Sequence, residues 1–219
     1  MTTPVRDGTP PTTPGARVRD LARTQGAAPA LRELLGPPDP AVPPHAPHGF
    51  AVLPQEHAEL AGYAGRSVEA LRTYALPGGP LTLVRVDRVG PGDRCAPPFD
   101  AAALLWLRLG LAEALRRACV EHLRDRPSGD STVLLQPLVK AQLAEATAAQ
   151  LELAAWLGEG AADDVPAARL RGPHAQVTEN GRALLRLFGA HGFLADGPGG
   201  VAHLSELLAD VHQDTEGAR

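Results

Sequence analysis

The chain has 219 residues, which is enough for one main hydrophobic core with at most a small additional unit. Its formal net charge of −4 provides no broad positive field for nucleic acid or an anionic membrane. No apolar run is long enough to span a bilayer, and residues 1–15 lack the apolar region of a secretory signal. Cys95 and Cys119 do not indicate a disulfide framework, so we expect a cytoplasmic protein.

The N-terminal segment, 1–48, is rich in proline and glycine. Residues 1–15 cannot bury enough apolar surface to offset the entropy of ordering them, which predicts a disordered tail. Residues 16–35 carry a helical stripe that is interrupted near Gly26 and Pro29, so we expect one or two short helices there. The prolines between residues 37 and 48 remove backbone donors and favour a linker.

The next segment, 49–98, is predicted to combine a helix and a strand. Residues 54–74 place alanines, leucines and tyrosines among charges at helical spacing. Residues 81–89 read L-T-L-V-R-V-D-R-V, which is the best strand candidate in the chain. We therefore expect a short α/β appendage before the main domain.

The remaining segment, 99–217, is predicted to form an antiparallel four-helix bundle. The first helix is apolar nearly all round, so it must be buried between neighbours. Short breaks at prolines and glycines separate it from three more helices and favour antiparallel packing. The predicted helices span 100–123, 132–157, 177–188 and 201–212. The fold class is therefore mainly α.

Two motifs within this bundle resemble the acyl-CoA dehydrogenase family. Residues 121–129 read E-H-L-R-D-R-P-S-G and are similar to the segment E-x-x-x-x-R-x-x-F-G, in which a long helix of that family ends. Residues 186–193 read R-L-F-G-A-H-G-F and are similar to the family's turn Q-x-x-G-G-x-G-[YF]. The resemblance covers 99–217 and identifies this segment as similar to the family's C-terminal helical domain.

The resemblance implies a flavin site that is shared between subunits. In the family, the corresponding arginine, glutamine and glycines touch the ADP part of FAD bound mainly to a neighbouring subunit. Carried across, this implies Arg126, Arg186, Gly189 and Gly192 as FAD-binding residues, in a homo- or hetero-oligomer with an acyl-CoA dehydrogenase-like subunit. The family's catalytic glutamate often follows the last bundle helix, which implies Glu216 as the base in α,β-desaturation of an acyl thioester.

Departures from the family pattern keep two functions open. Arg186 replaces the glutamine, Ala190 replaces a glycine, and the β-domain segments that grip the flavin ring have no counterpart. The first hypothesis is a truncated subunit that acts with a flavin-bearing partner. The alternative is a flavin-free bundle, repurposed as an enzyme or binding protein in secondary metabolism, with a ligand near His122, Arg126 and His191. The histidine spacing predicts no metal site.

Overall fold

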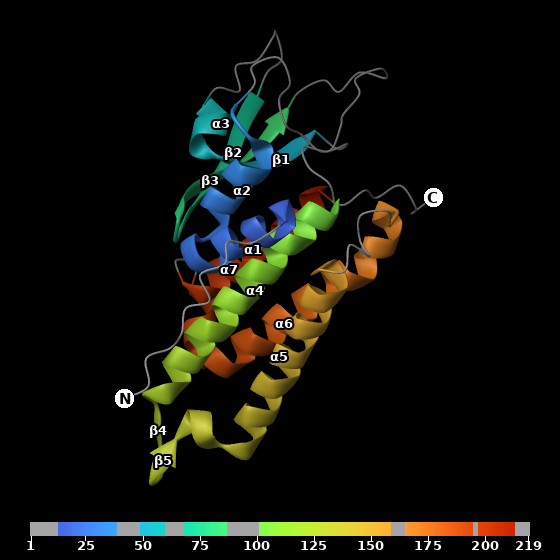
Figure 1. Cartoon of the computed structure of the whole chain (residues 1–219). Coiled ribbons are helices and arrows are strands. Elements are labelled where there is room, and N and C mark those ends of the chain that lie inside the picture. Colours follow the sequence, from blue (N-terminus) through green and yellow to red (C-terminus); the bar gives the residue numbers. More distant parts are fainter. Residues whose placement is uncertain are drawn as a thin grey trace, which may run out of the picture.

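The computed structural model describes residues 13–38, 49–59, 68–86, 101–158, 165–194 and 197–212. Within these ranges the chain is mainly helical, with a small three-stranded antiparallel sheet beside the N-terminal helices (Figure 1). The predicted fold class, a helical bundle with a short α/β appendage, is confirmed. The predicted disordered tail lies almost entirely outside the described residues. None of the described helices is both long enough and apolar enough to cross a membrane.

The bundle is built around one long central helix, α4. Its four members are α4 (Ala101–Arg124), α5 (Pro137–Gly158), α6 (Arg171–Phe188) and α7 (Pro198–His212). One side of α4 packs with α5 and α6 through residues such as Leu105 and Leu109. The opposite side packs with the N-terminal helices, the sheet and α7 through Leu104 and Leu107. Over residues 101–115 the sequence of α4 is apolar nearly all round and no residue is exposed, as expected for a helix that is covered on both sides.

Two short N-terminal helices pack beside α4, and the first of them contacts it at Gly110. They are α1 (Pro14–Gln25), which Thr13 caps, and α2 (Ala27–Leu35). Gly26 separates them with φ +98°, a left-handed conformation that favours glycine. Pro29 lies in the first turn of α2, where its missing N–H is tolerated. The predicted break is therefore confirmed at Gly26 but not at Pro29.

The small sheet has the strand order β1–β3–β2, with all pairs antiparallel. The strands are β1 (Phe50–Pro54), β2 (Val68–Leu76) and β3 (Gly79–Val86), and the short helix α3 (Gln55–Glu59) follows β1. The strand prediction is confirmed through Val86. The predicted helix over 54–74 is wrong for 68–74, because the tight turn at Pro77–Gly78 pairs this segment with β3 and backbone pairing outweighs local spacing.

The connections between the bundle helices differ from the expected bounds. A small hairpin of β4 (Pro127–Ser128) and β5 (Ser131–Thr132) and the 3-10 turn η1 (Val133–Leu135) precede α5, so this helix starts later than predicted. The 3-10 turn η2 (Ala167–Leu170) leads into α6, which starts earlier than predicted. A third turn, η3 (Gly189–Phe193), follows α6.

Candidate functional site

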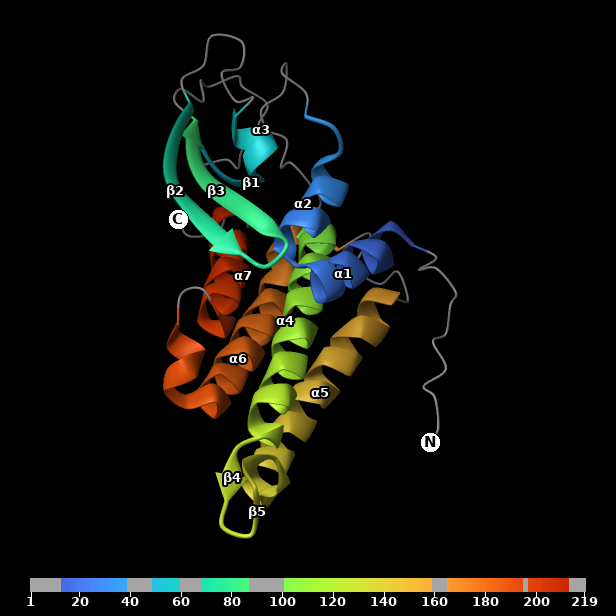
Figure 2. The ribbon, with the colours of Figure 1, turned by 90° about the vertical axis from the view of Figure 1, so that its left-hand side faces the viewer.

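The two sequence motifs meet at one end of the bundle. α4 ends at Arg124, two residues before Arg126, and α6 ends at Phe188, directly before Gly189. Figures 1 and 2 show these helix ends side by side, near the β4–β5 hairpin. Gly189 adopts φ +60°, and its N–H donates to the carbonyl oxygen of Arg186, which closes α6. The turn after α6 is thereby held beside the end of α4.

Residues from both helix ends form what we call the basic cluster, which consists of Arg126, His122, His191 and Gly189. The rings of His122 and His191 are stacked, with centroids 4.9 Å apart and 7° between their planes. Arg126 Nη1 lies 3.3 Å from His122 Nε2. A Cβ atom on Gly189 would lie 4.0 Å from Arg126 Nη1, so the guanidinium borders the glycine turn. The buried ring of Phe188 supports the stack, 5.2 Å from the His122 ring.

The basic cluster carries positive charge without a neutralising carboxylate among the described residues. Partial burial, the His191 ring and the Arg126 guanidinium all lower the pKa of His122. His122 is therefore neutral at pH 7 and can accept a hydrogen bond from Arg126. The guanidinium keeps further N–H donors for a ligand, and its planar fork suits carboxylate or phosphate oxygens.

Two of the other predicted site residues, Gly192 and Arg186, take no part in the described contacts of the basic cluster. Gly192 is buried, and a Cβ atom there would lie 2.6 Å from the carbonyl oxygen of Leu185, so this glycine allows η3 to pack against α6. Arg186 is exposed in the last turn of α6, and its side chain makes no hydrogen bond or ion pair within the described ranges. Glu216 lies outside the described residues. The structure thus brings Arg126, Gly189 and His191 together and leaves Arg186 apart from their contacts.

A buried polar network around Arg108 was missed from the sequence. Arg108 is fully buried in α4 and donates to Ser205 Oγ (3.1 Å), His174 Nδ1 (2.9 Å) and Thr178 Oγ1 (2.7 Å). Burial lowers the pKa of Arg108 to about 10, so it stays charged at pH 7. Burial and the Arg108 charge lower the pKa of His174 to about 3. The network connects α4 with α6 and α7. In the sequence, the feature that could have indicated it is Arg108, a single charged residue within the apolar run of α4.

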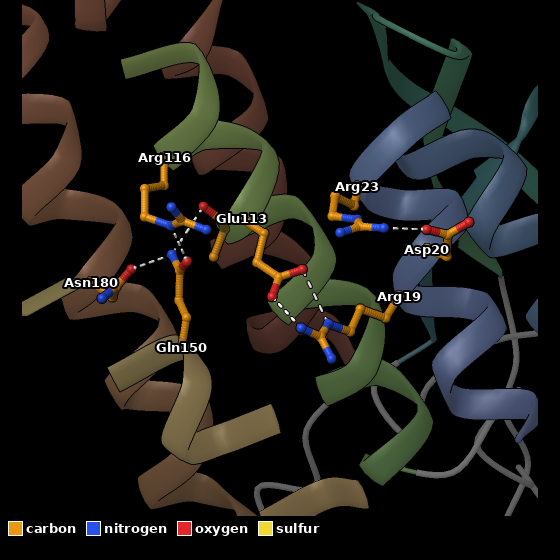
Figure 3. Close-up of polar contacts among 8 residues, drawn as sticks. Arg19, Asp20, Arg23, Glu113, Arg116, Gln150 and Asn180 are labelled. Atoms are coloured by element: carbon orange, nitrogen blue, oxygen red, sulfur yellow. Dashed lines mark hydrogen bonds and ion pairs between the residues drawn. The ribbon is translucent and has the colours of Figure 1, made fainter. Parts of the chain in front are cut away.

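Further polar contacts hold the neighbouring helices in place on α4 (Figure 3). The buried carboxylate of Glu113 accepts two hydrogen bonds from Arg19 of α1, one of them from Nε at 3.0 Å. Gln150 of α5 accepts a hydrogen bond from Arg116 Nε (2.8 Å) and donates one to Asn180 Oδ1 of α6 (2.9 Å). These contacts fix α1, α5 and α6 around the helix that leads to the basic cluster.

Comparisons with known proteins give a likeness among solved structures only. No family model matches the sequence. No curated protein matches it either. Among solved structures, the chain is similar to a chain of a steroid acyl-CoA dehydrogenase variant titled Tcur3481-Tcur3483, with 17% sequence identity and a TM-score of 0.49. The match covers 66% of this chain but 44% of that chain, so this protein spans less than half of its length.

Proposed function

We propose that this chain is an acyl-CoA dehydrogenase-like subunit whose basic cluster binds the pyrophosphate of FAD carried by a partner subunit. The observation that carries the proposal is the contact between the two motifs. Arg126 and Gly189 are 63 residues apart in the sequence, yet Arg126 Nη1 lies 4.0 Å from the position of a Gly189 Cβ atom. A phosphate group could therefore meet the guanidinium and the exposed glycine backbone at once.

The chemistry of the basic cluster fits a phosphate group. Arg126 offers a full positive charge, and no carboxylate of the described residues pairs with it. The C-terminal ends of α4 and α6 oppose an anion, because each carries roughly half a negative charge. The Arg126 guanidinium lies against both helix ends, 3.3 Å from His122 Nε2, and its full positive charge exceeds the partial negative charge of either end.

The reaction that we propose for the assembly is α,β-desaturation of an acyl thioester. FAD, when bound, supplies the hydride acceptor for this chemistry. Residues of this chain would hold the phosphates in place, with Arg126 as the cation and the Gly189 turn as the point of close backbone approach. The resemblance also assigns Glu216 as the base that removes the α-proton.

The test compares flavin retention between two arginine variants. The full chain is coexpressed with acyl-CoA dehydrogenases encoded beside its gene, and the purified complex is assayed by native mass and visible flavin absorption. We expect Arg126→Gln to weaken flavin retention roughly tenfold or more, because it removes a charged hydrogen-bond donor. The control is Arg124→Gln, which replaces an exposed arginine in the last turn of α4, two residues before Arg126. Equal flavin content in both variants, or no partner that copurifies, would contradict the proposal.

The flavin-free alternative is favoured by Arg186 and Ala190, which replace the family's glutamine and glycine. In this case the basic cluster would bind a smaller anionic ligand in an enzyme or binding protein of secondary metabolism. A colourless homodimer that binds inorganic phosphate through His122, Arg126 and His191 would support this function over the first one.

A further inference from the structure

A second site lies along the middle of α4. A cavity of about 480 Å³ is bounded by the end of α1, the start of α7, the middle of α4 and the turn between β2 and β3. Figure 2 shows this turn beside the N-terminal helices. On α4 the cavity extends to Ala118, about one helical turn before His122, and none of the basic-cluster residues lines it. Its volume is in the range of pockets that hold small organic ligands.

The inner part of the cavity is apolar. Its lining includes the buried side chains of Ala22, Ala27, Leu111, Leu115 and Leu204. These residues come from the four helices α1, α2, α4 and α7. An apolar part of a ligand would therefore be removed from water there.

The rim of the cavity is positively charged. Arg23 and Arg117 line it, and no aspartate or glutamate is found among its described lining residues. Arg117 Nη2 donates to the carbonyl oxygen of Arg23 at 3.1 Å, and Arg117 forms no ion pair with any described residue. Arg23 pairs with Asp20 at 2.6 Å, so its charge is already partly compensated. The unpaired charge at this rim is therefore mainly that of Arg117.

Close backbone packing holds two walls of the cavity together. Gly26 and Gly78 both line it and both have positive φ, +98° and +93°. A Cβ atom on Gly26 would lie 2.2 Å from the carbonyl oxygen of Pro77, and one on Gly78 would lie 2.1 Å from that of Gln25. The turn of the sheet and the junction between α1 and α2 thus fit together only through glycine. The cavity is preformed by this contact.

We propose that this cavity binds an amphipathic anion, with its apolar body inside and a compact carboxylate or phosphate headgroup at Arg117. The apolar lining accounts for the body, and the unpaired guanidinium accounts for the headgroup. A cationic molecule fits less well, because the charged side chains that line the cavity are the two arginines and no carboxylate lies among the described lining residues. This inference does not depend on the proposed flavin site.

The test measures binding of three probes with the same apolar chain, namely dodecanoate, dodecyl phosphate and 1-dodecanol, to the purified full chain by calorimetry. We expect one of the two anions to bind at least tenfold more tightly than the alcohol, and the tighter anion identifies the headgroup. Arg117→Gln should abolish this difference, whereas Arg124→Gln, on the same helix outside the cavity, should preserve it.

A second variant tests the apolar part. Ala114 is half-buried and lines the cavity on α4, so Ala114→Phe should weaken binding of all three probes while the far-ultraviolet circular dichroism stays unchanged. If Ala114→Phe does not fold, Arg117→Gln alone decides, because Arg117 is exposed and its replacement spares the core. Equal affinities for the alcohol and both anions, or identical binding by Arg117→Gln and Arg124→Gln, would overturn the proposal.

Discussion

Replacing Gly110 by alanine should test how closely α1 packs on α4. Gly110 lies in the middle of α4, where alanine is favoured over glycine by about 1 kcal/mol in an unconstrained helix. A Cβ atom at this position, however, would lie 2.3 Å from the carbonyl oxygen of Arg19 and 2.8 Å from Ala22 Cβ. Since ordinary contacts begin at 3.4 Å, α1 would have to move by about 1 Å.

The higher helix propensity of alanine stabilises the variant, whereas the clash of its Cβ atom with α1 destabilises it. The larger of these two free energies decides whether the variant is less stable than the wild type. Overpacking a well-packed site costs roughly 1–3 kcal/mol, occasionally more, and backbone cannot yield as a flexible side chain does. We therefore expect Gly110→Ala to lower the free energy of unfolding by about 1–2 kcal/mol. Gly181 is the matched control, because it is also buried within a helix but a Cβ atom there would meet only Leu115 Cδ2 at 4.0 Å. Gly181→Ala should raise the free energy of unfolding by about 0.5–1 kcal/mol.

Urea unfolding followed by circular dichroism measures both changes, with equal slopes for the variants and the wild type as the check on two-state behaviour. The free energies of unfolding of the two variants should differ by about 1.5–3 kcal/mol. If Gly110→Ala is as stable as Gly181→Ala, then α1 does not pack on α4 as described, and the cavity between them loses one of its walls.

Two further stability predictions follow from buried charges and rings. Arg19→Ala leaves the buried carboxylate of Glu113 without its partner and should lower the free energy of unfolding by about 3–5 kcal/mol. Its control, Arg23→Ala, breaks the exposed pair with Asp20 and should lower the free energy of unfolding by less than about 1 kcal/mol. Urea unfolding measures both changes. Burial lowers the pKa of His174 to about 3 and that of His212 to about 4, so below pH 6.5 the unfolded chain binds more protons than the folded one. The free energy of unfolding should therefore fall as the pH drops from 6.5 towards 4, by about 2 kcal/mol for each histidine at pH 5. A smaller fall in His212→Gln than in the wild type would give the part of this loss that comes from His212.

The candidate site was predictable in part, because its residues belong to short motifs. Arg126 and the Gly189 turn could be selected from the sequence since helix ends and glycine turns leave local signals. The stacking of His191 on His122 could not be derived that way, because it depends on how the ends of two helices meet. Gly192, which the motif assigned to the cofactor, is buried against α6, and only the packing shows this.

The sequence by itself determined the helical bundle, because apolar periodicity and proline or glycine breaks are local properties of the chain. It also determined that α4 lies between neighbouring elements, since a helix that is apolar nearly all round over its first half must be covered there. Only the tertiary structure decided that residues 68–76 form a strand, because this depends on pairing with β3. It also decided that Arg117 lies unpaired at the rim of an apolar cavity, since a cavity is formed by segments that are distant in the sequence and meet only in the folded protein.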